Sequence, residues 1–490
     1  MRKLRTGVLS IICIGVLLLG VMPVLAVPAE QGDEPGCQEG WASLESVAFP
    51  GKFTIWAACT GAYAQELHEM RSIVERFWGP MTEFMGIEPI PDEGKESAGG
   101  DSAIDFYLAD RETGVPQRGV GAPGPQMYGY ARPTAPFVGV SSSGFVVMRR
   151  EMLGDPQFKD TLTHEFFHVL QQARNARLTF NWDIRPDDDP EWDTLVFAEP
   201  WWVEGTAEWA GFRFTRDLPD QDSTRLIGHH QRFSYFLSYS SDIPLHAPQQ
   251  RREPGWAFMY STDIWFHFME QEIGPEAVAE IWKEFAGLGP NDTEQAMAII
   301  DAKLSFEQHF RDFAVRNLNL ALQPGDPIDP SYDDLDPAFP IAAAHNDVNL
   351  DSQISSNELT PPLVVGEVDD EAELPITSAG DEPRRFPDRL RSLIAHYYRF
   401  LPAPNGAQLL LDFSGLAPAA DLDVDALVKV EDGEWERRQL AAAGSTTYCL
   451  SNPEDAVEEF YLILSNHNRD LFSVVEGEFT AQVLGEQCAA

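Results

Sequence analysis

His164-Glu165-Phe166-Phe167-His168 is the stretch from which the fold of this chain can be argued. The pattern H-E-x-x-H lies inside an apolar run with helical spacing, which predicts a helix over about Phe158–Arg177. Residues four apart lie on one face of a helix, about 6 Å apart along its axis. Two imidazoles placed in this way can bind one zinc ion, and Glu165 is then placed to act on a zinc-bound water.

A third ligand is expected from the segment Glu199–Trp209, which reads E-P-W-W-V-E-G-T-A-E-W and falls in a second predicted helix, Trp201–Phe214. Glu204 and Glu208 share one face of that helix. One of them can bind zinc while the other accepts the free ring N–H of a histidine. Gly205 would permit a close approach of the two helices. The alternative is a solvated acidic face, which the surrounding tryptophans do not suit.

The pattern H-E-x-x-H, followed on a later helix by E-G-x-A-E, resembles the gluzincin metallopeptidases, including the thermolysin-like and aminopeptidase-N-like groups. The resemblance implies that His164, His168 and Glu204 bind zinc. It also implies that Glu165 is the general base and acid, and that Glu208 supports a zinc ligand. The third-histidine pattern of the metzincins is absent, because position 174 is an arginine.

A further likeness concerns the segment Met259–Phe266, at the start of a predicted helix. In aminopeptidase-N-like enzymes a tyrosine at this place stabilises the tetrahedral oxyanion, so the resemblance assigns Tyr260 to that role. Asp263 replaces the usual glycine, and the alternative is a buried tyrosine with a satisfied hydroxyl. The stretch Phe145–Met148 is interpreted either as a strand that pairs with an extended substrate or as a simple core strand.

The remaining pattern predicts an α+β fold, with a small mixed sheet and a helical zincin catalytic domain followed by a C-terminal all-β sandwich. Residues 27–150 would hold the sheet and 151–324 the helices with the zinc site. An acidic linker is expected at 325–358 and the sandwich at 359–490. The helices and strands expected from periodicity and turn residues are helices at Ala64–Met85, Trp256–Glu272, Pro275–Phe285, Asp292–Lys303 and Ser305–Leu322, and strands at Ile104–Ala109, Phe137–Val140, Ile394–Phe400, Gln408–Phe413, Ala426–Val430, Glu459–Leu464 and Leu471–Val483.

The first 26 residues are interpreted as a cleaved signal peptide, with a basic start, an apolar core and a small residue at Ala26. The alternative is an uncleaved membrane anchor; no later stretch predicts a membrane span. Export predicts a secreted protein, free or associated with the cell surface, and oxidised cysteines. The simplest pairing is Cys37–Cys59 and Cys449–Cys488, although three pairings are possible and no CxxC spacing indicates a cysteine zinc site.

The chain is strongly acidic, with 35 basic and 78 acidic residues and a formal charge of −43. Because nucleic acids and anionic membranes carry the same sign of charge, the composition disfavours both as partners. A protein or peptide substrate is what the resemblance to the gluzincin metallopeptidases implies.

The sequence contains three other motifs. Asp347, Asn349, Asp351 and Glu358 follow the spacing of an EF-hand calcium loop, with a plain inter-domain loop as the alternative. The glycines of 119–124 match G-x-G-x-x-G, but prolines in and after the turn argue against a dinucleotide site. His229-His230 lacks partnered ligands and predicts only a polar face.

Two functions follow from this reading. The first is a secreted zinc metallopeptidase, in which zinc activates water and Glu165 handles its proton. The second is an inactive zincin-fold protein that binds partners through its sandwich. Zinc hydrolysis of a non-peptide bond stays open as a third possibility.

Overall fold

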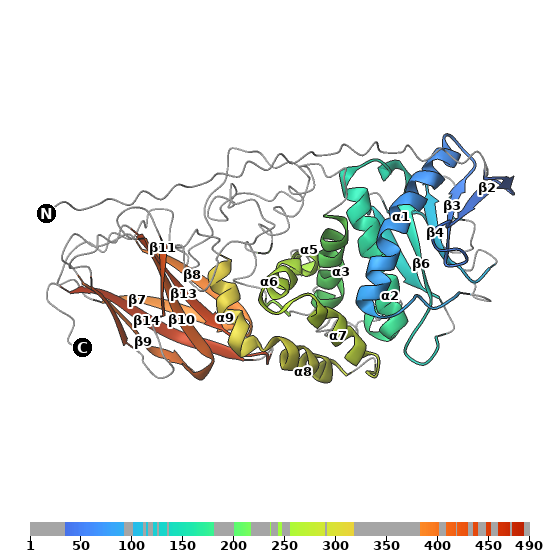
Figure 1. The fold of residues 1–490 in the computed structure, drawn as a ribbon. Coiled ribbons are helices and arrows are strands. Elements are labelled where there is room, and N and C mark those ends of the chain that lie inside the picture. Colours follow the sequence, from blue (N-terminus) through green and yellow to red (C-terminus); the bar gives the residue numbers. More distant parts are fainter. Residues whose placement is uncertain are drawn as a thin grey trace, which may run out of the picture.

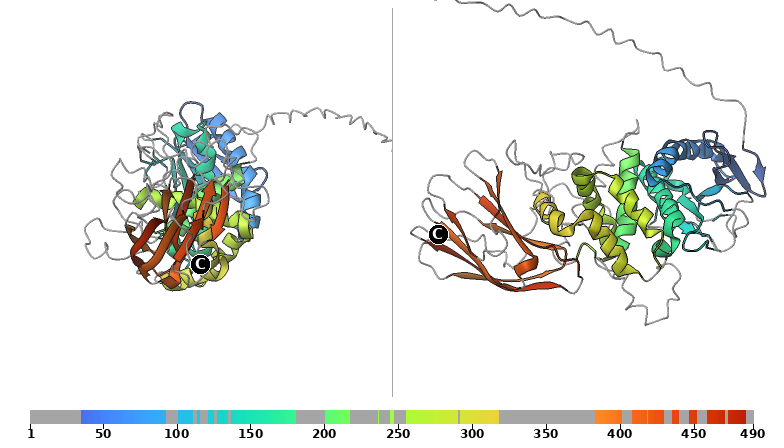
Figure 2. Two further views of the ribbon diagram at one scale, coloured as in Figure 1. Left: turned by 90° about the vertical axis from the view of Figure 1, so that its left-hand side faces the viewer. Right: turned by 60° about the horizontal axis from the view of Figure 1, so that its bottom comes forward.

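The structure is a computed structural model of the 490-residue chain (Figure 1). It describes residues 35–92, 101–110, 114–115, 121–124, 127–134, 137–180, 200–216, 236, 244–246, 255–289, 292–317, 383–400, 408–417, 419–429, 435–439, 447–451, 459–470 and 473–484. Helices and strands are mixed, and the predicted α+β class is confirmed at this level. An N-terminal sheet and two C-terminal sheets lie at opposite ends, with helices between them (Figures 1 and 2).

The N-terminal sheet has six strands in the order β1-β2-β3-β4-β6-β5. The strands are β1 Cys37–Gln38, β2 Trp41–Glu45, β3 Phe53–Ala58, β4 Ile104–Ala109, β5 Gly129–Pro133 and β6 Gly144–Arg149. The central pairs β3–β4 and β4–β6 are parallel, and the pairs nearer the edges are antiparallel. All six residues of β4 are buried, as expected for a strand that is covered on both faces.

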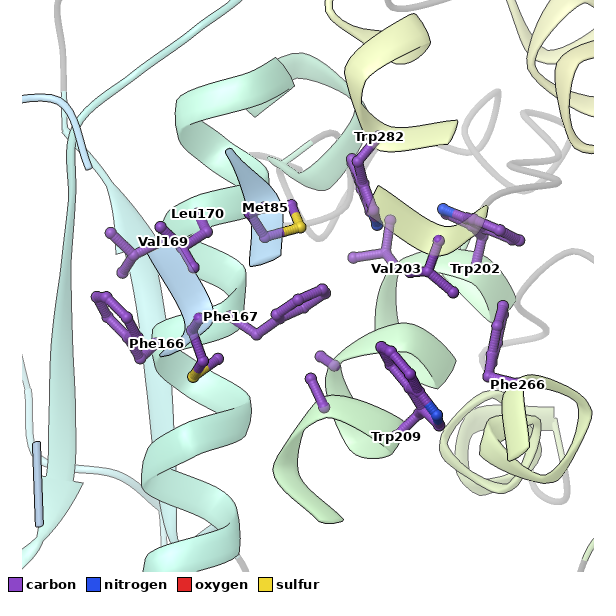
Figure 3. Close-up of a cluster of buried hydrophobic side chains, with 14 of the residues drawn as sticks. Met85, Phe166, Phe167, Val169, Leu170, Trp202, Val203, Trp209, Phe266 and Trp282 are labelled. Atoms are coloured by element: carbon purple, nitrogen blue, oxygen red, sulfur yellow. The ribbon is translucent and has the colours of Figure 1, made fainter. Parts of the chain in front are cut away.

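Helices α1 Tyr63–Met85 and α2 Pro156–Phe180 pack against this sheet. The motif helix contributes to that packing through Phe166, whose ring lies 4.7 Å from that of Trp78 on α1 and 5.9 Å from that of Phe106 on β4. In Figure 3, Phe166 points toward the sheet and Phe167 toward the side on which Val203 lies. The two phenylalanines inside H-E-x-x-H therefore anchor α2 on both sides.

The remaining helices are α3 Pro200–Thr215, α5 Gly255–Ser261, α6 Asp263–Ile273, α7 Glu276–Phe285, α8 Thr293–Leu304 and α9 Phe306–Arg316. Most of their buried apolar side chains belong to the same hydrophobic cluster as those of the N-terminal sheet. Trp202 on α3 shows the continuity, since its ring contacts Phe266 on α6 and Phe285 on α7. The helical part and the sheet thus share one core.

The C-terminal part consists of two four-stranded antiparallel sheets, β11-β10-β13-β8 and β12-β9-β14-β7. Their strands are β7 Arg384–Arg391, β8 Ile394–Phe400, β9 Gln408–Ala417, β10 Leu422–Lys429, β11 Trp435–Gln439, β12 Thr447–Ser451, β13 Glu459–Asn466 and β14 Val474–Leu484. One buried cluster contains side chains of both sheets, such as Leu411 and Leu464. The antiparallel strands expected in this region are therefore present.

Helix α9 joins the helical part to the C-terminal sheets. Ala314 and Val315 are buried in a cluster with side chains of β8, β10 and β13, and the Tyr397 hydroxyl donates to the Ala314 carbonyl at 2.9 Å. Asp425, buried on β10, accepts hydrogen bonds at 2.9 Å from Arg311 on α9 and from Arg437 on β11. Removing either partner of such a buried ion pair leaves an uncompensated charge. The contact therefore fixes the position of α9 relative to the sheet.

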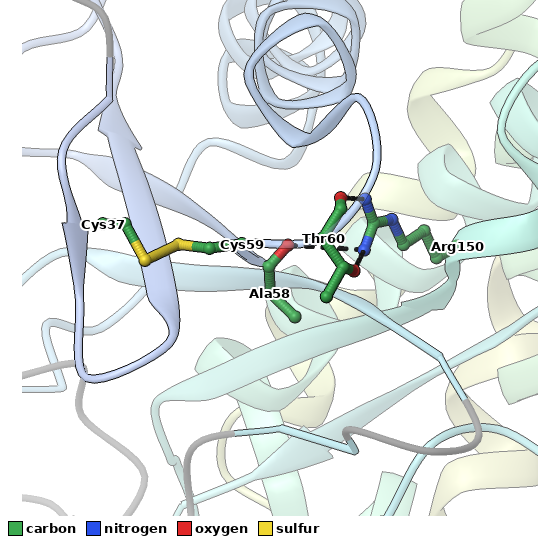
Figure 4. Close-up of a disulfide and its surroundings, with 5 residues drawn as sticks. All are labelled: Cys37, Ala58, Cys59, Thr60 and Arg150. Atoms are coloured by element: carbon green, nitrogen blue, oxygen red, sulfur yellow. Dashed lines mark hydrogen bonds between the residues drawn. A yellow bond between two sulfur atoms is a disulfide. The ribbon is translucent and has the colours of Figure 1, made fainter.

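Cys37 and Cys59 form a disulfide, which confirms this part of the predicted pairing (Figure 4). It ties β1 to the end of β3. Beyond it, the guanidinium of Arg150 donates to the Thr60 hydroxyl at 2.6 Å and to the Ala58 carbonyl at 3.3 Å. The second predicted pair includes Cys488, which lies outside the described residues.

Several local predictions were wrong. The stretch Phe137–Val140 is a tight turn closed by a bridge between Val138 and Ser141, because Gly139 adopts a left-handed conformation there. The helix expected over Trp256–Glu272 is interrupted at Thr262 between α5 and α6. Strands β1, β2, β3, β5, β7, β11 and β12 were not predicted, since short strands gain their stability from neighbours that are distant in sequence.

Candidate metal centre and cavity

Helix α2 brings the two histidines of the motif together. His164 and His168 are buried, their rings lie 4.6 Å apart at an interplanar angle of 85°, and their Nε2 atoms are separated by 2.9 Å. This closeness follows from the four-residue spacing on one helix face. Both Nε2 atoms point to the same place.

Helix α3 brings Glu204 to that place. Its Oε2 atom lies 3.4 Å from Nε2 of His164 and 3.4 Å from Nε2 of His168, and the carboxylate is 2% exposed. Among the residues that the structure describes, these three form the one group of histidine, cysteine and acidic side chains close enough to share a metal ion. The three residues proposed as ligands from the sequence are thus neighbours in space.

The separations suit a tetrahedral metal ion. Ligand atoms at 2.0–2.1 Å from zinc in a tetrahedron lie about 3.3–3.4 Å from one another, and both distances from Glu204 have this size. The 2.9 Å between the imidazole nitrogens of His164 and His168 is shorter, as for one ring N–H donating to the other nitrogen. A donor set of two imidazoles and one carboxylate is one that zinc accepts.

His164, His168 and Glu204, here called the triad, stabilise one another's charges when no metal is bound. Burial by itself would raise the pKa of Glu204, but the charge of His168 and the hydrogen bonds of both imidazoles outweigh it and lower this pKa to about 2. Burial would lower the pKa of His168, but Glu204 raises it to about 9. The site therefore holds a carboxylate and a cationic imidazole when no divalent ion replaces the proton.

Glu165 lies in the wall of the same cavity and is 7% exposed. Burial raises its pKa above the ordinary value; the two imidazoles oppose this rise, and the carboxylates of Glu204 and Glu208 add to it. A carboxyl group whose proton is held more tightly than usual is suited to exchange protons with a substrate.

Glu208 lies one turn after Glu204 on α3. Its Oε1 atom is 3.6 Å from Nδ1 of His164, which is longer than a hydrogen bond but places the carboxylate at the ring nitrogen that does not face the triad. The structure thus brings the carboxylate of Glu208 to the His164 ring.

Gly205 was predicted to permit the close approach of α2 and α3, and this prediction was wrong. A Cβ atom on Gly205 would lie 2.4 Å from the Thr262 hydroxyl and 2.6 Å from the Phe266 ring, so Gly205 faces the segment that leads into α6. A Cβ atom on Gly211 would lie 2.9 Å from the Asp160 carbonyl and 3.5 Å from the His164 Cβ atom. Gly211 is therefore the residue that lets α3 approach α2.

Tyr260 lies near the end of α5 and lines the cavity with the triad. Its ring centroid is 6.2 Å from that of His164. Burial, followed by the charges of Glu204, Glu165 and Glu208, raises the pKa of Tyr260 well above its ordinary value. The hydroxyl consequently keeps its proton at neutral pH and can donate a hydrogen bond into the cavity.

The cavity has a volume of about 440 Å³. Besides the triad, Glu165 and Tyr260, it is lined by residues that sequence reasoning did not assign to the site: Gly121, Ala122, Pro123, Gly124, Met127, Gly129, Tyr130, Ala131, Arg132, Pro133, Gln172 and Thr179. Most of them belong to β5 or to the Gly/Pro-rich segment before it. The available signal for a short strand was the run Tyr130–Arg132 between a glycine and a proline, two residues that often bound strands.

The interpretation of Phe145–Met148 as a strand that pairs with substrate is wrong. These residues belong to β6, which has β4 on one side and β5 on the other, so its backbone groups are already paired. Among the described residues, β5 is one of the two edge strands of this sheet, and its residues line the cavity.

Several other predictions lie outside the described residues. They are the signal peptide 1–26, His229-His230, the linker 325–358 and the calcium loop with Asp347, Asn349, Asp351 and Glu358. Within the described residues, no helix is both long enough and apolar enough to cross a membrane.

Comparisons with known proteins give no family. No family model matches the sequence, and no curated protein matches it. Among solved structures, one similar chain is a periplasmic inhibitor of g-type lysozyme from Aeromonas hydrophila, at 12% identity and a TM-score of 0.16, over 22% of this chain and 93% of that one. Another is a family GH115 4-O-methyl-alpha-glucuronidase, at 8% identity and a TM-score of 0.13, over 81% of this chain and 53% of that one. At these TM-scores neither likeness carries an argument.

Proposed function

We propose that this protein is a secreted zinc-dependent metallopeptidase of the gluzincin type. The observation that carries the proposal is the convergence of His164 Nε2, His168 Nε2 and Glu204 Oε2, which come from two helices and lie 2.9–3.4 Å apart. Export is supported by the apolar, basic-headed N-terminus and by the disulfide between Cys37 and Cys59.

The surroundings of the triad favour a polypeptide substrate. The cavity beside the triad is bounded by β5, an edge strand among the described residues. An extended peptide can add to such an edge through main-chain hydrogen bonds, with alternate side chains entering pockets. The acidic charge of the chain disfavours nucleic acid as the substrate.

The chain's own residues then have distinct tasks. A zinc ion held by His164, His168 and Glu204 would acidify a water molecule and polarise the scissile carbonyl. The carboxylate of Glu165 would take a proton from the attacking water and deliver it to the nitrogen of the leaving amine. The hydroxyl of Tyr260 donates a hydrogen bond to the oxygen on which negative charge develops.

The test compares wild type with Glu165→Gln, which keeps the shape of the side chain but removes its basicity. We expect both proteins to bind one zinc ion, measured by metal analysis after dialysis. We expect only wild type to cleave a denatured protein substrate, with kcat/KM reduced at least about 100-fold in the variant.

A matched control is Glu280→Gln, which makes the same change at an exposed position of α7. It should retain both zinc and activity. If wild type binds zinc but cleaves neither denatured proteins nor a peptide library, the peptidase proposal is wrong, and binding through the C-terminal sheets becomes the better account.

A further inference from the structure

Gln171 is a buried residue that connects the two helices of the metal centre. It lies on α2 three residues after His168 and is 0% exposed. Its Oε1 atom is 2.7 Å from Nδ1 of His168. Its Nε2 atom is 3.0 Å from the carbonyl of Val203 and 3.0 Å from the hydroxyl of Thr206, both on α3. All three polar contacts of this amide are therefore with residues of α2 and α3, the helices that carry His164, His168 and Glu204.

The orientation of the Gln171 amide follows from its partners on α3. The Val203 carbonyl can only accept a hydrogen bond, so the atom that faces it must be the amide nitrogen. The Thr206 hydroxyl donates to the Trp202 carbonyl at 2.6 Å, which leaves its oxygen to accept from the same amide nitrogen. Turning the amide over would place its oxygen against the Val203 carbonyl, and the two acceptors would repel each other.

With the amide held in this way, its oxygen faces Nδ1 of His168. That nitrogen must carry the hydrogen and donate it to Oε1 of Gln171. In a neutral imidazole the other nitrogen, Nε2, then has its lone pair free. This atom is the one that lies 3.4 Å from Oε2 of Glu204 and 2.9 Å from Nε2 of His164.

We infer that Gln171 is a positioning residue that fixes the tautomer and ring orientation of His168 for metal binding. The same amide sets the register of α3, because Val203 directly precedes the ligand Glu204. This inference rests on the metal-binding part of the proposed function and is independent of the reaction that the site performs.

The two histidines are oriented by different chemistry. His164 faces the carboxylate of Glu208 at 3.6 Å, whereas His168 faces a neutral amide at hydrogen-bond distance. Outer partners of metal-bound histidines raise the basicity of the ring and hold it in place, and their loss lowers metal affinity roughly 10- to 100-fold. Gln171 supplies the hydrogen bond without adding a fourth carboxylate to a site that already holds Glu165, Glu204 and Glu208.

The experiment compares Gln171→Met with Gln171→Glu. Methionine has a similar length and fills the space but cannot accept the proton of His168, whereas glutamate keeps an oxygen there. We expect the zinc affinity to fall roughly 10- to 100-fold in Gln171→Met and to fall less in Gln171→Glu. Zinc affinity is measured by competition with a chromophoric chelator, and the visible spectrum of the cobalt derivative reports any change of coordination.

The order of the two variants separates positioning from packing. If Gln171 only filled space, methionine would be tolerated better than a buried carboxylate, and Gln171→Met would bind zinc at least as tightly as Gln171→Glu. That order, or a wild-type zinc affinity in Gln171→Met, would overturn the inference. Failure of wild type to cleave peptides would contradict the proposed function but leave this comparison intact.

Two further variants keep the test decisive if Gln171→Met folds poorly. Thr206→Val removes one of the two acceptors that hold the amide and should weaken zinc binding by a smaller factor than Gln171→Met. Gln157→Met makes the same change in the first turn of α2, at a residue that does not line the cavity. It serves as the control for zinc affinity and for the cobalt spectrum, both of which should stay as in wild type. Equal losses in Gln171→Met and Gln157→Met would show that the effect is not specific to the His168 contact.

Discussion

Oε2 of Glu204 lies 3.4 Å from Nε2 of His168, although the two residues belong to different helices. The contact is buried and joins a carboxylate to an imidazole whose other nitrogen is already held by Gln171. The consequences of this arrangement for metal binding, catalysis and stability can be measured separately.

Zinc should stabilise the folded protein. The three ligand atoms converge only in the fold, so an ion bound there stabilises by about 2.7 kcal/mol when its free concentration is 100 times the Kd. We expect zinc to raise the Tm of wild type and not that of His168→Ala, measured by differential scanning fluorimetry before and after removal of metal by chelation. His68→Ala, at an exposed site on α1, is the control and should respond as wild type does. An equal zinc response in His168→Ala would contradict the assignment of this ligand.

Tyr260→Phe should lower kcat about 100-fold and leave KM and zinc affinity nearly unchanged. The ring beside His164 is kept, and only the hydroxyl that would donate to the developing oxyanion is lost. Steady-state kinetics on a peptide substrate with a fluorescent reporter measures the effects on kcat and on KM separately. A change in KM with kcat preserved would show that Tyr260 binds substrate and does not stabilise the transition state.

Gly211→Ala should destabilise the protein and weaken zinc binding together. The added Cβ atom would lie 2.9 Å from the backbone carbonyl of Asp160, which cannot move without shifting α2 and its histidines. Overpacking of this kind costs about 1–3 kcal/mol. Gly287→Ala is the matched control, since no atom lies within 4 Å of its added Cβ. Urea unfolding and zinc titration of both variants check the prediction, which fails if Gly211→Ala retains the wild-type values.

Acidification should destabilise the contact between residues 244–246 and the C-terminal sheets. His246 is 0% exposed, and its Nε2–H donates to the Arg469 carbonyl at 3.0 Å. Burial lowers the pKa of His246 to about 4, although the Arg469 hydrogen bond and the charge of Asp470 oppose this shift. Between about pH 6.5 and 4 the unfolded chain binds a proton there that the folded chain does not, so the free energy of unfolding falls as the pH falls.

Protonation of His246 lowers the free energy of unfolding by at most roughly 3 kcal/mol, and this loss is complete below about pH 4. Urea unfolding of wild type and His246→Gln at pH 7 and pH 4.5 checks it. Glutamine can keep a donor for the Arg469 carbonyl but does not titrate, so the variant should lose less stability on acidification. An identical loss in both proteins would assign the acid sensitivity to other groups.

The local chemistry of the site could be predicted from the sequence. Four-residue spacing on a helix placed His164 with His168, and a second acidic pair with the same spacing pointed to Glu204 and Glu208. The long helices and the strand Ile104–Ala109 were predicted for the same reason, because their apolar periodicity is strong and lies within a single element.

The misassigned and missing parts depend on contacts between elements that are distant in sequence. Strand β5 has only five residues, and its role as the edge of the sheet follows from its pairing with β6. The choice of Gly211 over Gly205 as the point of approach depends on which face of α3 meets α2. The orientation of Gln171 depends on a carbonyl of the other helix.

The sequence by itself determined the residue types of the candidate ligands, their helical spacing, the acidic charge and the alternation of helical and strand-rich regions, because these properties are encoded over a few neighbouring residues. Only the tertiary structure decided that the candidate ligands on α2 and α3 converge, that β5 borders their cavity and that Gln171 contacts His168. These relationships arise when elements that are distant in sequence exclude water from one shared core. The contacts that then form between them cannot be predicted from any single segment.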